Sequence, residues 1–504
     1  MERGRILWID DEMELLLPHV LYLRERGYSV ETSVSGVDGL GMARGGRYDM
    51  VFLDEEMPGM GGLETLGELR KLSGVGSVVL VTRNEGEGVM EAAIGGGVSD
   101  YLIKPVSREQ LLVTVKKHIH GAELRGGSIE RGYGAWYGAC RGKVRELGVE
   151  GWEELYKGLV EWGLQLEGIG GGMVEVLRGQ WQEAEEEFGR YVRGQYAGWI
   201  KGAGGSPLLS PGVYGEKIAP LLEGGVKVWW VVIDNLRWDQ WRELRSQLPV
   251  SMPVEEGMYW SILPTTTQYS RNALFSGLLP LEVKRRYPGL WKEEGEEGSK
   301  NASEAVYLED QMKRLGGVYG LSYRKGVGLE GLKGGKERNL NVVVLNFVDM
   351  LSHAGMDSLV VRELSRGEAG YREVVGSWLR HSGLGELLER VVGSGGKVVL
   401  TTDHGTVRVE RSVRIQGSRE LNANVRYKSG KHLTYDSGSV YEVLEPEEVG
   451  LPGVGVGSRY VFAVGQDFFV YPNGYHEHVR RYKETYQHGG VSMEEMLVPL
   501  AVIG

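Results

Sequence analysis

Six Asp and His side chains in the C-terminal half of the chain stand where extended, apolar segments end. They occur in "VWWVVIDN", "VLNFVDMLSH", "VVLTTDHG" and "YQHGGVS", as Asp234, Asp349, His353, Asp403, His404 and His488. Imidazole and carboxylate groups are the ligands that zinc ions take when positions must stay open for a substrate. The pattern therefore predicts a centre for two zinc ions in this half of the chain.

A run of threonines lies between the first and the second of these segments. Thr265, Thr266 and Thr267 form the middle of "LPTTTQYSRN". A hydroxyl beside two metal ions is a nucleophile, because the metal stabilises its alkoxide. The predicted centre therefore has a candidate nucleophile, and the residue types alone leave three choices.

The N-terminal 120 residues carry a second, unrelated set of acidic residues. Asp10 and Asp11 follow one extended segment and Asp54 ends another, while Thr82 and Lys104 follow two more. Three carboxylates that converge repel one another unless a hard cation such as Mg²⁺ neutralises them. Lys104 adds a positive charge that suits a phosphoryl oxygen. These residues predict a magnesium-dependent site for a phosphoryl group.

Both sets require strands that end at one edge of a sheet. In the N-terminal part, short strands rich in β-branched residues are predicted at 5–10, 29–34, 49–54, 77–82 and 100–103. Amphipathic segments separate them, such as 12–26, which is predicted to place Leu15, Leu16, His19, Val20 and Leu23 on one face. Alternating strands and helices indicate a doubly wound parallel sheet, which binds ligands at the carboxyl ends of its strands.

The rest of the chain is predicted to contain a helical segment followed by a second α/β domain. Residues 142–167 and 174–200 show helical spacing of Trp, Leu, Val and Tyr, and Trp136 and Trp152 are predicted to lie in a bundle core. No basic recognition helix is visible, so a DNA-reading module is not expected. The segment "GAGGSPLLSPG" at 202–212 is typical of a linker. Beyond it, near-continuous apolar runs predict central parallel strands.

Composition excludes several classes of protein. The formal net charge of −11 argues against a protein that coats nucleic acid. The single cysteine, Cys140, rules out an internal disulfide framework and suits a reducing cytoplasm. No apolar run reaches the roughly 18 residues of a membrane span, so none is expected.

The N-terminal set resembles the receiver domain of two-component response regulators. The segments "DD", "LDEEMPGMGG", "VT" and "KP" occur in the family's order at the predicted strand ends. The resemblance implies that Asp54 accepts a phosphoryl group. It also implies the remaining receiver roles: Asp10 and Asp11 as Mg²⁺ ligands with the carbonyl of Glu56, Thr82 and Tyr101 as the switch pair, and Lys104 before a proline whose peptide bond is usually cis.

The C-terminal set, taken in order, resembles the alkaline phosphatase superfamily, and "LPTTTQYSRN" with "QHGGVSMEEMLVP" resembles its PglZ branch. The resemblance spans about residues 213–504. It implies one zinc held by Asp349, His353 and His488, and another held by Asp234, Asp403 and His404. The family pattern places the nucleophile three residues after the proline, which favours Thr267 over Thr266. Arg271 and Asn272 are expected either to steady a phosphoryl oxygen or to pack the following helix.

The whole chain resembles the PorX-type response regulators of type IX secretion. The expected organisation is a flavodoxin-like receiver domain at 1–120, a helical connector bundle at 121–204, and an alkaline-phosphatase-like α/β domain at 205–504. The resemblance implies a cytoplasmic protein that a sensor histidine kinase phosphorylates and that becomes a homodimer on activation. It further implies hydrolysis of phosphodiesters in oligonucleotides or cyclic nucleotides, and contacts with a secretion-motor protein and a sigma factor.

Two other functions compete with a phosphodiesterase. The first is a phosphorylation-gated docking module for secretion or transcription partners, with little or no catalysis; a docking surface needs no threonine at the metals. The second is sulfate or phosphate monoester hydrolysis. A sulfatase uses a modified Cys or Ser, and Cys140 lies outside this domain. The sequence leaves the choice between diester and monoester open.

Overall fold

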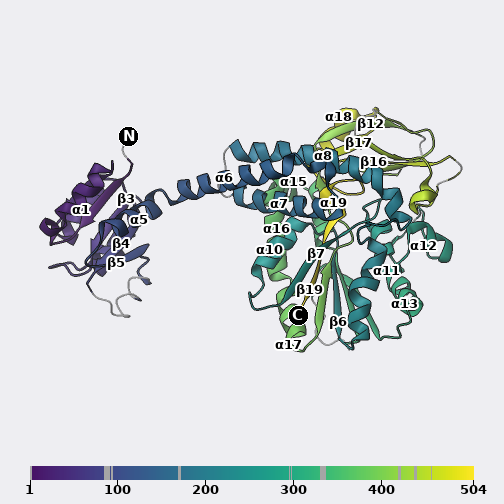
Figure 1. Ribbon diagram of the computed structural model, residues 1–504, viewed down its shortest axis with the longest axis horizontal. Helices are drawn as coiled ribbons and strands as arrows, with labels where there is room; N and C mark the ends of the chain where they lie inside the picture. The colour runs from purple at the N-terminus through teal and green to yellow at the C-terminus, as the bar shows by residue number, and fades with distance from the viewer. Residues whose placement is uncertain are drawn as a thin grey trace. The chain divides into compact units, whose positions relative to one another are not determined.

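The computed structural model describes two compact units, one ending at Tyr133 and the other beginning at Gly134 (Figure 1). The described residues are 3–83, 91, 95–167, 172–293, 296, 298–329, 337–417, 422–435, 440–453, 455 and 457–504. The first unit contains a five-stranded parallel sheet with the strand order β2-β1-β3-β4-β5. Its strands are β1 (Arg5–Ile9), β2 (Ser29–Ser33), β3 (Tyr48–Asp54), β4 (Val75–Thr82) and β5 (Asp100–Ile103). The predicted doubly wound sheet is confirmed.

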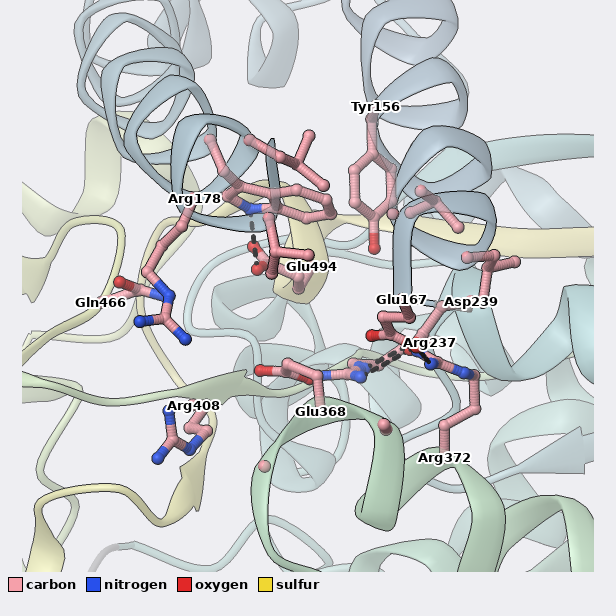
Figure 2. Close-up of a pocket in the computed structure, with 18 of the residues that line it drawn as sticks. Tyr156, Glu167, Arg178, Arg237, Asp239, Glu368, Arg372, Arg408, Gln466 and Glu494 are labelled. Carbon is pink, nitrogen blue, oxygen red and sulfur yellow. Dashed lines mark hydrogen bonds and ion pairs between the residues drawn. The ribbon is translucent and has the colours of Figure 1, made fainter. Parts of the chain in front are cut away.

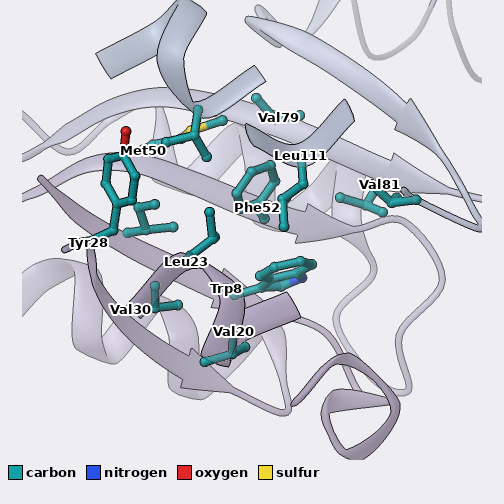
Figure 3. Close-up of a cluster of buried hydrophobic side chains, with 13 residues drawn as sticks. Trp8, Val20, Leu23, Tyr28, Val30, Met50, Phe52, Val79, Val81 and Leu111 are labelled. Carbon is teal, nitrogen blue, oxygen red and sulfur yellow. The ribbon is translucent and has the colours of Figure 1, made fainter. Parts of the chain in front are cut away.

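Helices cover both faces of this sheet. They are α1 (Met13–Glu25), α2 (Gly36–Gly45), α3 (Gly62–Leu69) and α5 (Arg108–Ile119). Side chains of α1 and α5 pack with Trp8 and Phe52 on one face (Figure 3). Side chains of α2 and α3 pack with Leu7 and Leu53 on the other face.

The predicted apolar face of α1 is wrong at one position. Val20 and Leu23 are buried against the sheet and Leu16 packs beside them, but Leu15 is 69% exposed. Positions 16, 20 and 23 share one side of a helix, and a neighbouring residue is rotated by about 100° from them. The hydrophobic pattern alone therefore predicts the wrong side of the helix for Leu15.

The second unit is built on a six-stranded sheet with the order β7-β19-β10-β6-β9-β8. The strands are β6 (Val228–Ile233), β7 (Val254–Trp260), β8 (Leu321–Gly326), β9 (Leu340–Leu345), β10 (Lys397–Thr401) and β19 (Leu497–Ile503). Strands β10, β6, β9 and β8 are parallel, and β19 runs antiparallel to both of its neighbours. All residues of β6 and β9 are buried, as expected for the central strands of an α/β sheet.

Helices and short strands complete the second unit. The helices in chain order are α7 (Val149–Glu167), α8 (Gly172–Ile200), α9 (Ala219–Glu223), α10 (Trp238–Gln247), α11 (Asn272–Ser276), α12 (Pro280–Arg286), α13 (Glu304–Arg314), α14 (Phe347–Asp357), α15 (Leu359–Leu364), α16 (Gly367–His381), α17 (Leu384–Gly393), α18 (Tyr475–Tyr482) and α19 (Met493–Met496). The short strands are β11 (Val407–Arg408), β12 (Arg411–Gln416), β13 (Tyr427–Gly430), β14 (Thr434–Tyr435), β15 (Val440–Val443), β16 (Arg459–Ala463), β17 (Asp467–Val470) and β18 (Tyr486–Gln487). Helix α6 (Gly121–Arg141) runs across the boundary between the two units.

The predicted helical connector shares its core with the six-stranded sheet. Trp152 on α7 meets Phe188 on α8 edge-to-face with ring centroids 5.2 Å apart. Phe188 and Trp199 in turn contact Trp260 at the end of β7, at 5.5 and 5.0 Å. Trp152 is buried as predicted, and Trp136 is half-buried. Helices α7 and α8 are therefore part of the second unit.

The segment 202–212 is not the free linker that its composition predicts. Ser210 is fully buried, and its hydroxyl accepts a hydrogen bond from the backbone N–H of Ile262 at 3.1 Å. Leu209 forms a β-bridge with Trp260. The leucines and prolines between the glycines give this segment enough apolar surface to pack beside β7.

None of the helices in the described part of the chain is long and apolar enough to cross a membrane.

Candidate functional site

The predicted metal ligands lie at the carboxyl edge of the six-stranded sheet. Asp234 directly follows β6, and Asp403 and His404 follow β10. Asp349 lies in the first turn of α14, which begins after β9. His488 follows β18. Because β10, β6 and β9 are adjacent and parallel, their carboxyl ends meet at one edge, where α/β sheets bind ligands.

The six residues form two neighbouring groups. In the first group, Asp234, Asp403 and His404 each place a ligand atom within 4.8 Å of the other two, and Asp349, His353 and His488 do the same in the second group. The two groups adjoin, because the rings of His404 and His488 stack with centroids 4.3 Å apart. These groups have the composition that the family resemblance implied for two metal sites.

The first group concentrates negative charge away from water. Burial raises the pKa of Asp234, and Arg271 opposes this shift. Burial also raises the pKa of Asp403 well above its usual range, and the neighbouring Asp234 adds to the effect. Arg271 compensates part of this charge, and a bound cation would compensate the rest.

The donors fit divalent metal ions. Oδ2 of Asp403 is buried and accepts no hydrogen bond from any residue that the structure describes. A buried, charged acceptor without a donor is costly in a protein interior, and a metal ion would satisfy it. In the second group, burial raises the pKa of Asp349, but the hydrogen bond and charge of His488 outweigh burial and hold that pKa below its usual range.

The three threonines have three different environments. The hydroxyl of Thr265 donates to the carbonyl of Gly490 at 2.9 Å and accepts from the N–H of Gly489 at 3.0 Å. The hydroxyl of Thr266 is buried and has no hydrogen-bond partner among the described residues. The hydroxyl of Thr267 lies 3.2 Å from Nε2 of His404 and 3.4 Å from Oδ1 of Asp234. Thr267 is therefore the threonine whose hydroxyl oxygen contacts the predicted ligands, whereas Thr265 contacts His488 only through its backbone carbonyl.

Arg271 lies at the carboxylates, whereas Asn272 is engaged elsewhere. Nη1 of Arg271 is 2.5 Å from Oδ2 of Asp234 and 3.7 Å from Oδ2 of Asp403. Asn272 donates to the carbonyl of Lys300 at 3.1 Å and accepts from the side chain of Asn301 at 3.0 Å. In these contacts Asn272 serves the packing role that was one of its two expected roles.

Several residues that support the site carry no motif in the sequence. Nε of Arg271 pairs with Glu304 at 2.6 Å, and Glu304 also accepts the hydroxyl of Tyr323. The amide of Asn301 donates to the backbone carbonyl of Thr267 at 2.8 Å. These contacts fix both the guanidinium and the backbone that presents the Thr267 hydroxyl.

A buried ion pair supports the loop after His488. Nη2 of Arg426 lies 2.5 Å from Oε2 of Glu495, and both side chains are fully buried. The other carboxylate oxygen of Glu495 accepts the N–H of Gly490 at 2.9 Å. Asn424 donates to the carbonyl of His488 at 3.0 Å. Glu495 lies in the segment "QHGGVSMEEMLVP", but only the fold brings Arg426 and Asn424 to it.

Gly405, the glycine of "DHG", lies so close to the backbone of Glu494 that a larger residue would not fit. A Cβ atom on Gly405 would lie 2.0 Å from the carbonyl oxygen of Glu494. Only glycine leaves room there, so this position keeps the loop after β10 against α19.

The first unit assembles its own acidic site. Asp10, Asp11 and Asp54 place ligand atoms within 4.8 Å of one another. Nζ of Lys104 lies 2.7 Å from Oδ1 of Asp54 and 2.8 Å from Oδ2 of Asp10. Burial raises the pKa of Asp54 to about 6, although Lys104 opposes the shift. The Lys104–Pro105 peptide bond is cis, as the receiver resemblance implied.

The other predicted receiver residues lie around this site or beside it. Thr82 is buried at the end of β4, and its hydroxyl donates to the carboxylate of Glu55. Tyr101 is 37% exposed and pairs in the sheet with Leu80, two residues before Thr82. Glu56 is exposed in the turn after β3.

Three sequence families match successive parts of the chain. The response regulator receiver domain matches residues 6–116, and the PorX response regulator linker domain matches residues 140–200. The BREX system PglZ alkaline phosphatase-like domain matches residues 213–503, which is more than half of the 504 residues.

Curated relatives and solved structures resemble the first unit. The uncharacterized transcriptional regulatory protein YkoG of Bacillus subtilis is 36% identical over 116 residues, which are 23% of this chain and 51% of that protein. The alginate biosynthesis transcriptional regulatory protein AlgB of Pseudomonas aeruginosa is 32% identical over 24% of this chain and 27% of its own length. The chain thus matches about half the length of the first relative and about a quarter of the second.

Among solved structures, the receiver domain of the sensor histidine kinase PA1611 from Pseudomonas aeruginosa is 26% identical. That match covers 23% of this chain and 98% of the other, with a TM-score of 0.22. A CheY-like receiver domain protein from Methanospirillum hungatei is 27% identical over 24% of this chain and 98% of the other, with a TM-score of 0.23.

Proposed function

The chain belongs to the PglZ family of alkaline phosphatase-like domains, and because a receiver domain and a PorX-type linker precede that domain, we propose that it is a phosphorylation-controlled phosphodiesterase. The match of all three parts to a PorX-type response regulator agrees with the resemblance drawn from the sequence. The proposed substrates are oligonucleotides or cyclic oligonucleotides, and the proposed role is regulation of type IX secretion.

One observation carries the proposal. The hydroxyl oxygen of Thr267 lies within 3.4 Å of two predicted metal ligands, His404 and Asp234. A hydroxyl in this position suits attack on phosphorus and has no purpose in a docking surface. The neighbouring Thr266 makes no such contact, so the geometry supports the choice of Thr267.

We assign the metal ligands to two zinc ions and one magnesium ion. Asp349, His353 and His488 would hold one zinc, and Asp234, Asp403 and His404 would hold the other. In the receiver, Asp10, Asp11 and the carbonyl of Glu56 would hold Mg²⁺, for which oxygen donors are typical. Bound zinc would supply Lewis acidity that favours the ionised hydroxyl and neutralises phosphoryl oxygens.

Residues of the chain have separate roles in the proposed two-step displacement at phosphorus. Thr267 Oγ1 loses its proton to water and attacks phosphorus, so that an Oγ1–P bond forms and the bond to the leaving alkoxide breaks. Water then cleaves the phosphothreonine ester and regenerates the hydroxyl. Arg271, which Glu304 holds beside Asp234, supplies a fixed positive charge near the phosphoryl oxygens. Asn301 holds the Thr267 backbone in place.

The experiment that tests this proposal is hydrolysis of a panel of chromogenic phosphate monoesters and diesters by the purified full-length protein. Hydrolysis of the diester is the expected result. Zinc content is measured on the same preparation, so that activity and metal can be compared directly.

In the receiver, we expect Asp54 to be the phospho-acceptor. Its carboxylate lies 2.7 Å from Nζ of Lys104, which can pair with a transferred phosphoryl group. Incubation with a small-molecule phosphodonor and Mg²⁺ should label the wild-type chain, and Asp54→Ala should abolish the label. Asp49→Ala, a change on the same strand, is the control that should leave labelling intact. Stoichiometric labelling of Asp54→Ala would overturn the assignment.

We also expect phosphorylation to shift the chain toward a homodimer. A phosphoryl group on Asp54 would attract the Thr82 hydroxyl away from Glu55, and Tyr101 on the adjacent strand would rearrange with it. Sedimentation at matched concentrations should show more dimer with a phosphate mimic bound. An unchanged distribution over a wide concentration range would indicate a constitutive assembly.

The partners proposed for this regulator follow its family match. A sensor histidine kinase is the proposed phosphodonor, because receiver domains are typically phosphorylated by such kinases. A secretion-motor protein and a sigma factor are the proposed downstream partners, with the cytoplasm as the compartment. The PorX-type linker match supports these proposals.

A further inference from the structure

A cavity of about 410 Å³ lies in the second unit (Figure 2). One wall is formed by α7 and α8. The opposite wall is formed by the residues after β6, the start of α16 and the strand β11. Neither Thr267 nor any of the six predicted ligands lines this cavity. It is therefore a second site, distinct from the catalytic one, and its volume is in the range of small-molecule sites.

The wall formed by α7 and α8 is largely apolar and aromatic. Its apolar and aromatic side chains are Tyr156, Val160, Leu164, Val174, Leu177 and Trp181, and Glu167 and Arg178 add charge at its edge. The ring of Trp181 meets the ring of Tyr156 edge-to-face at 6.0 Å, and the indole N–H of Trp181 is held by Glu494 at 3.0 Å. Flat, apolar ligand groups stack well on such a wall.

Tyr156 presents its hydroxyl to the cavity. Its side chain is only 1% exposed and its ring packs against that of Trp181. In Figure 2 it points from α7 into the cavity. Its hydroxyl can therefore hydrogen-bond to a polar group of a ligand that stacks on the same wall.

Three of the cavity's five carboxylates pair with two of its arginines. Arg237 pairs with Asp239 at 2.7 Å and with Glu368 at 2.7 Å. Arg372 pairs with Asp239 at 3.1 Å and also with Glu167. Over the whole lining, five arginines face five carboxylates, so the cavity has no excess of negative charge that would favour a cationic ligand.

Two other arginines retain capacity for an anion. Figure 2 shows Arg178 and Arg408 on the side of the cavity away from the Arg237 cluster. Nε of Arg408 is buried and has no hydrogen-bond partner among the residues described, although its Nη1 pairs with Glu410 at 2.6 Å and its Nη2 lies 3.5 Å from Glu484. Arg178 contacts Glu175 only at 3.4 Å. Guanidinium groups of this kind bind phosphate oxygens.

We propose that this cavity binds a nucleoside phosphate, with the base on the aromatic wall and the phosphate toward Arg178 and Arg408. The ligand would join α7 and α8 to the segments that follow β6 and β10. Those segments also carry catalytic ligands, since Arg237 is three residues after Asp234 and Arg408 is four residues after His404. The cavity is thus placed to connect the linker helices with the catalytic edge of the sheet.

Calorimetric titration of the full-length, metal-loaded protein with adenosine and guanosine 5′-monophosphates tests this proposal. Gly163 lies on α7 and lines the cavity, and a Cβ atom there would meet only Leu177, at 3.6 Å. Gly163→Leu should fill the cavity and remove one bound nucleotide per chain. Gly179→Leu on α8, where a Cβ atom would meet nothing within 4 Å, should leave the number unchanged.

Substitution of charged residues provides a second test of the proposal. This test does not depend on filling the cavity. Arg178→Gln should weaken the same binding event about tenfold. Arg190→Gln is the matched control, because Arg190 also lies on α8 and pairs with a glutamate three residues earlier. Nucleotide that binds at the catalytic metals would be retained in Gly163→Leu, so the two sites are counted separately. Equal binding by wild type and Gly163→Leu, including no binding by either, would overturn the proposal.

Discussion

Replacing Thr267 by valine is expected to reduce diester hydrolysis by about a thousandfold or more while the protein keeps its zinc. Valine has nearly the shape of threonine, so the packing around the π-helical turn Thr267–Arg271 should survive. The change removes the oxygen that lies 3.2 Å from His404 and 3.4 Å from Asp234. Metal content should persist, because the imidazole and carboxylate ligands contribute most of the affinity. Steady-state hydrolysis and metal analysis of one preparation measure both effects.

The adjacent threonine supplies the control for this substitution. Thr266 is more buried than Thr267, and its hydroxyl contacts none of the predicted ligands. Thr266→Val should therefore retain activity near that of the wild type. If Thr266→Val were inactive and Thr267→Val active, the nucleophile would be Thr266 and the mechanism would stand. If both variants kept full activity, the hydrolysis would arise at another site.

Replacing Asp349 by alanine is expected to lower both zinc content and activity. Asp349 contacts two histidines of its group, with Oδ2 3.6 Å from Nε2 of His353 and Oδ1 3.5 Å from Nε2 of His488. Loss of this anionic ligand leaves two imidazoles, which is too few to hold zinc tightly. Zinc content should fall toward one per chain, and diester hydrolysis should fall by at least about a hundredfold.

A surface aspartate provides the comparison for Asp349. Asp310 pairs with Arg286 and Arg314, far in sequence from the ligands. Asp310→Ala should leave both zinc content and hydrolysis unchanged. Full zinc content in Asp349→Ala would show that this carboxylate is not a ligand.

The strand-end residues could be predicted from sequence because their positions follow from local patterns. Each continuous apolar run, such as "VWWVVI" before Asp234, gave a buried strand whose end is readable from the letters. Asp349 and His353 share a face because α14 forms across them. The parallel order of β10, β6 and β9 then brings these ends together, which the alternation of strands and helices already indicated.

The supporting contacts could not be predicted, because they join distant segments. Glu304 lies 33 residues after Arg271, and Arg426 lies 69 residues before Glu495. Neither pair has a fixed spacing that a motif could record. The same holds for the linker helices, whose packing depends on Trp260 of β7. The packing of residues 207–210 and the exposure of Leu15 have a related cause, since neither composition nor hydrophobicity says what a residue packs against.

The measurement that tests the central claim most directly combines zinc analysis of the purified full-length protein with its hydrolysis of an aryl phosphodiester and an aryl phosphomonoester. We predict about two zinc ions per chain and hydrolysis of the diester that disappears in Thr267→Val. Zinc-loaded wild-type protein that hydrolyses neither ester would contradict the account and would favour a metal-containing docking module instead.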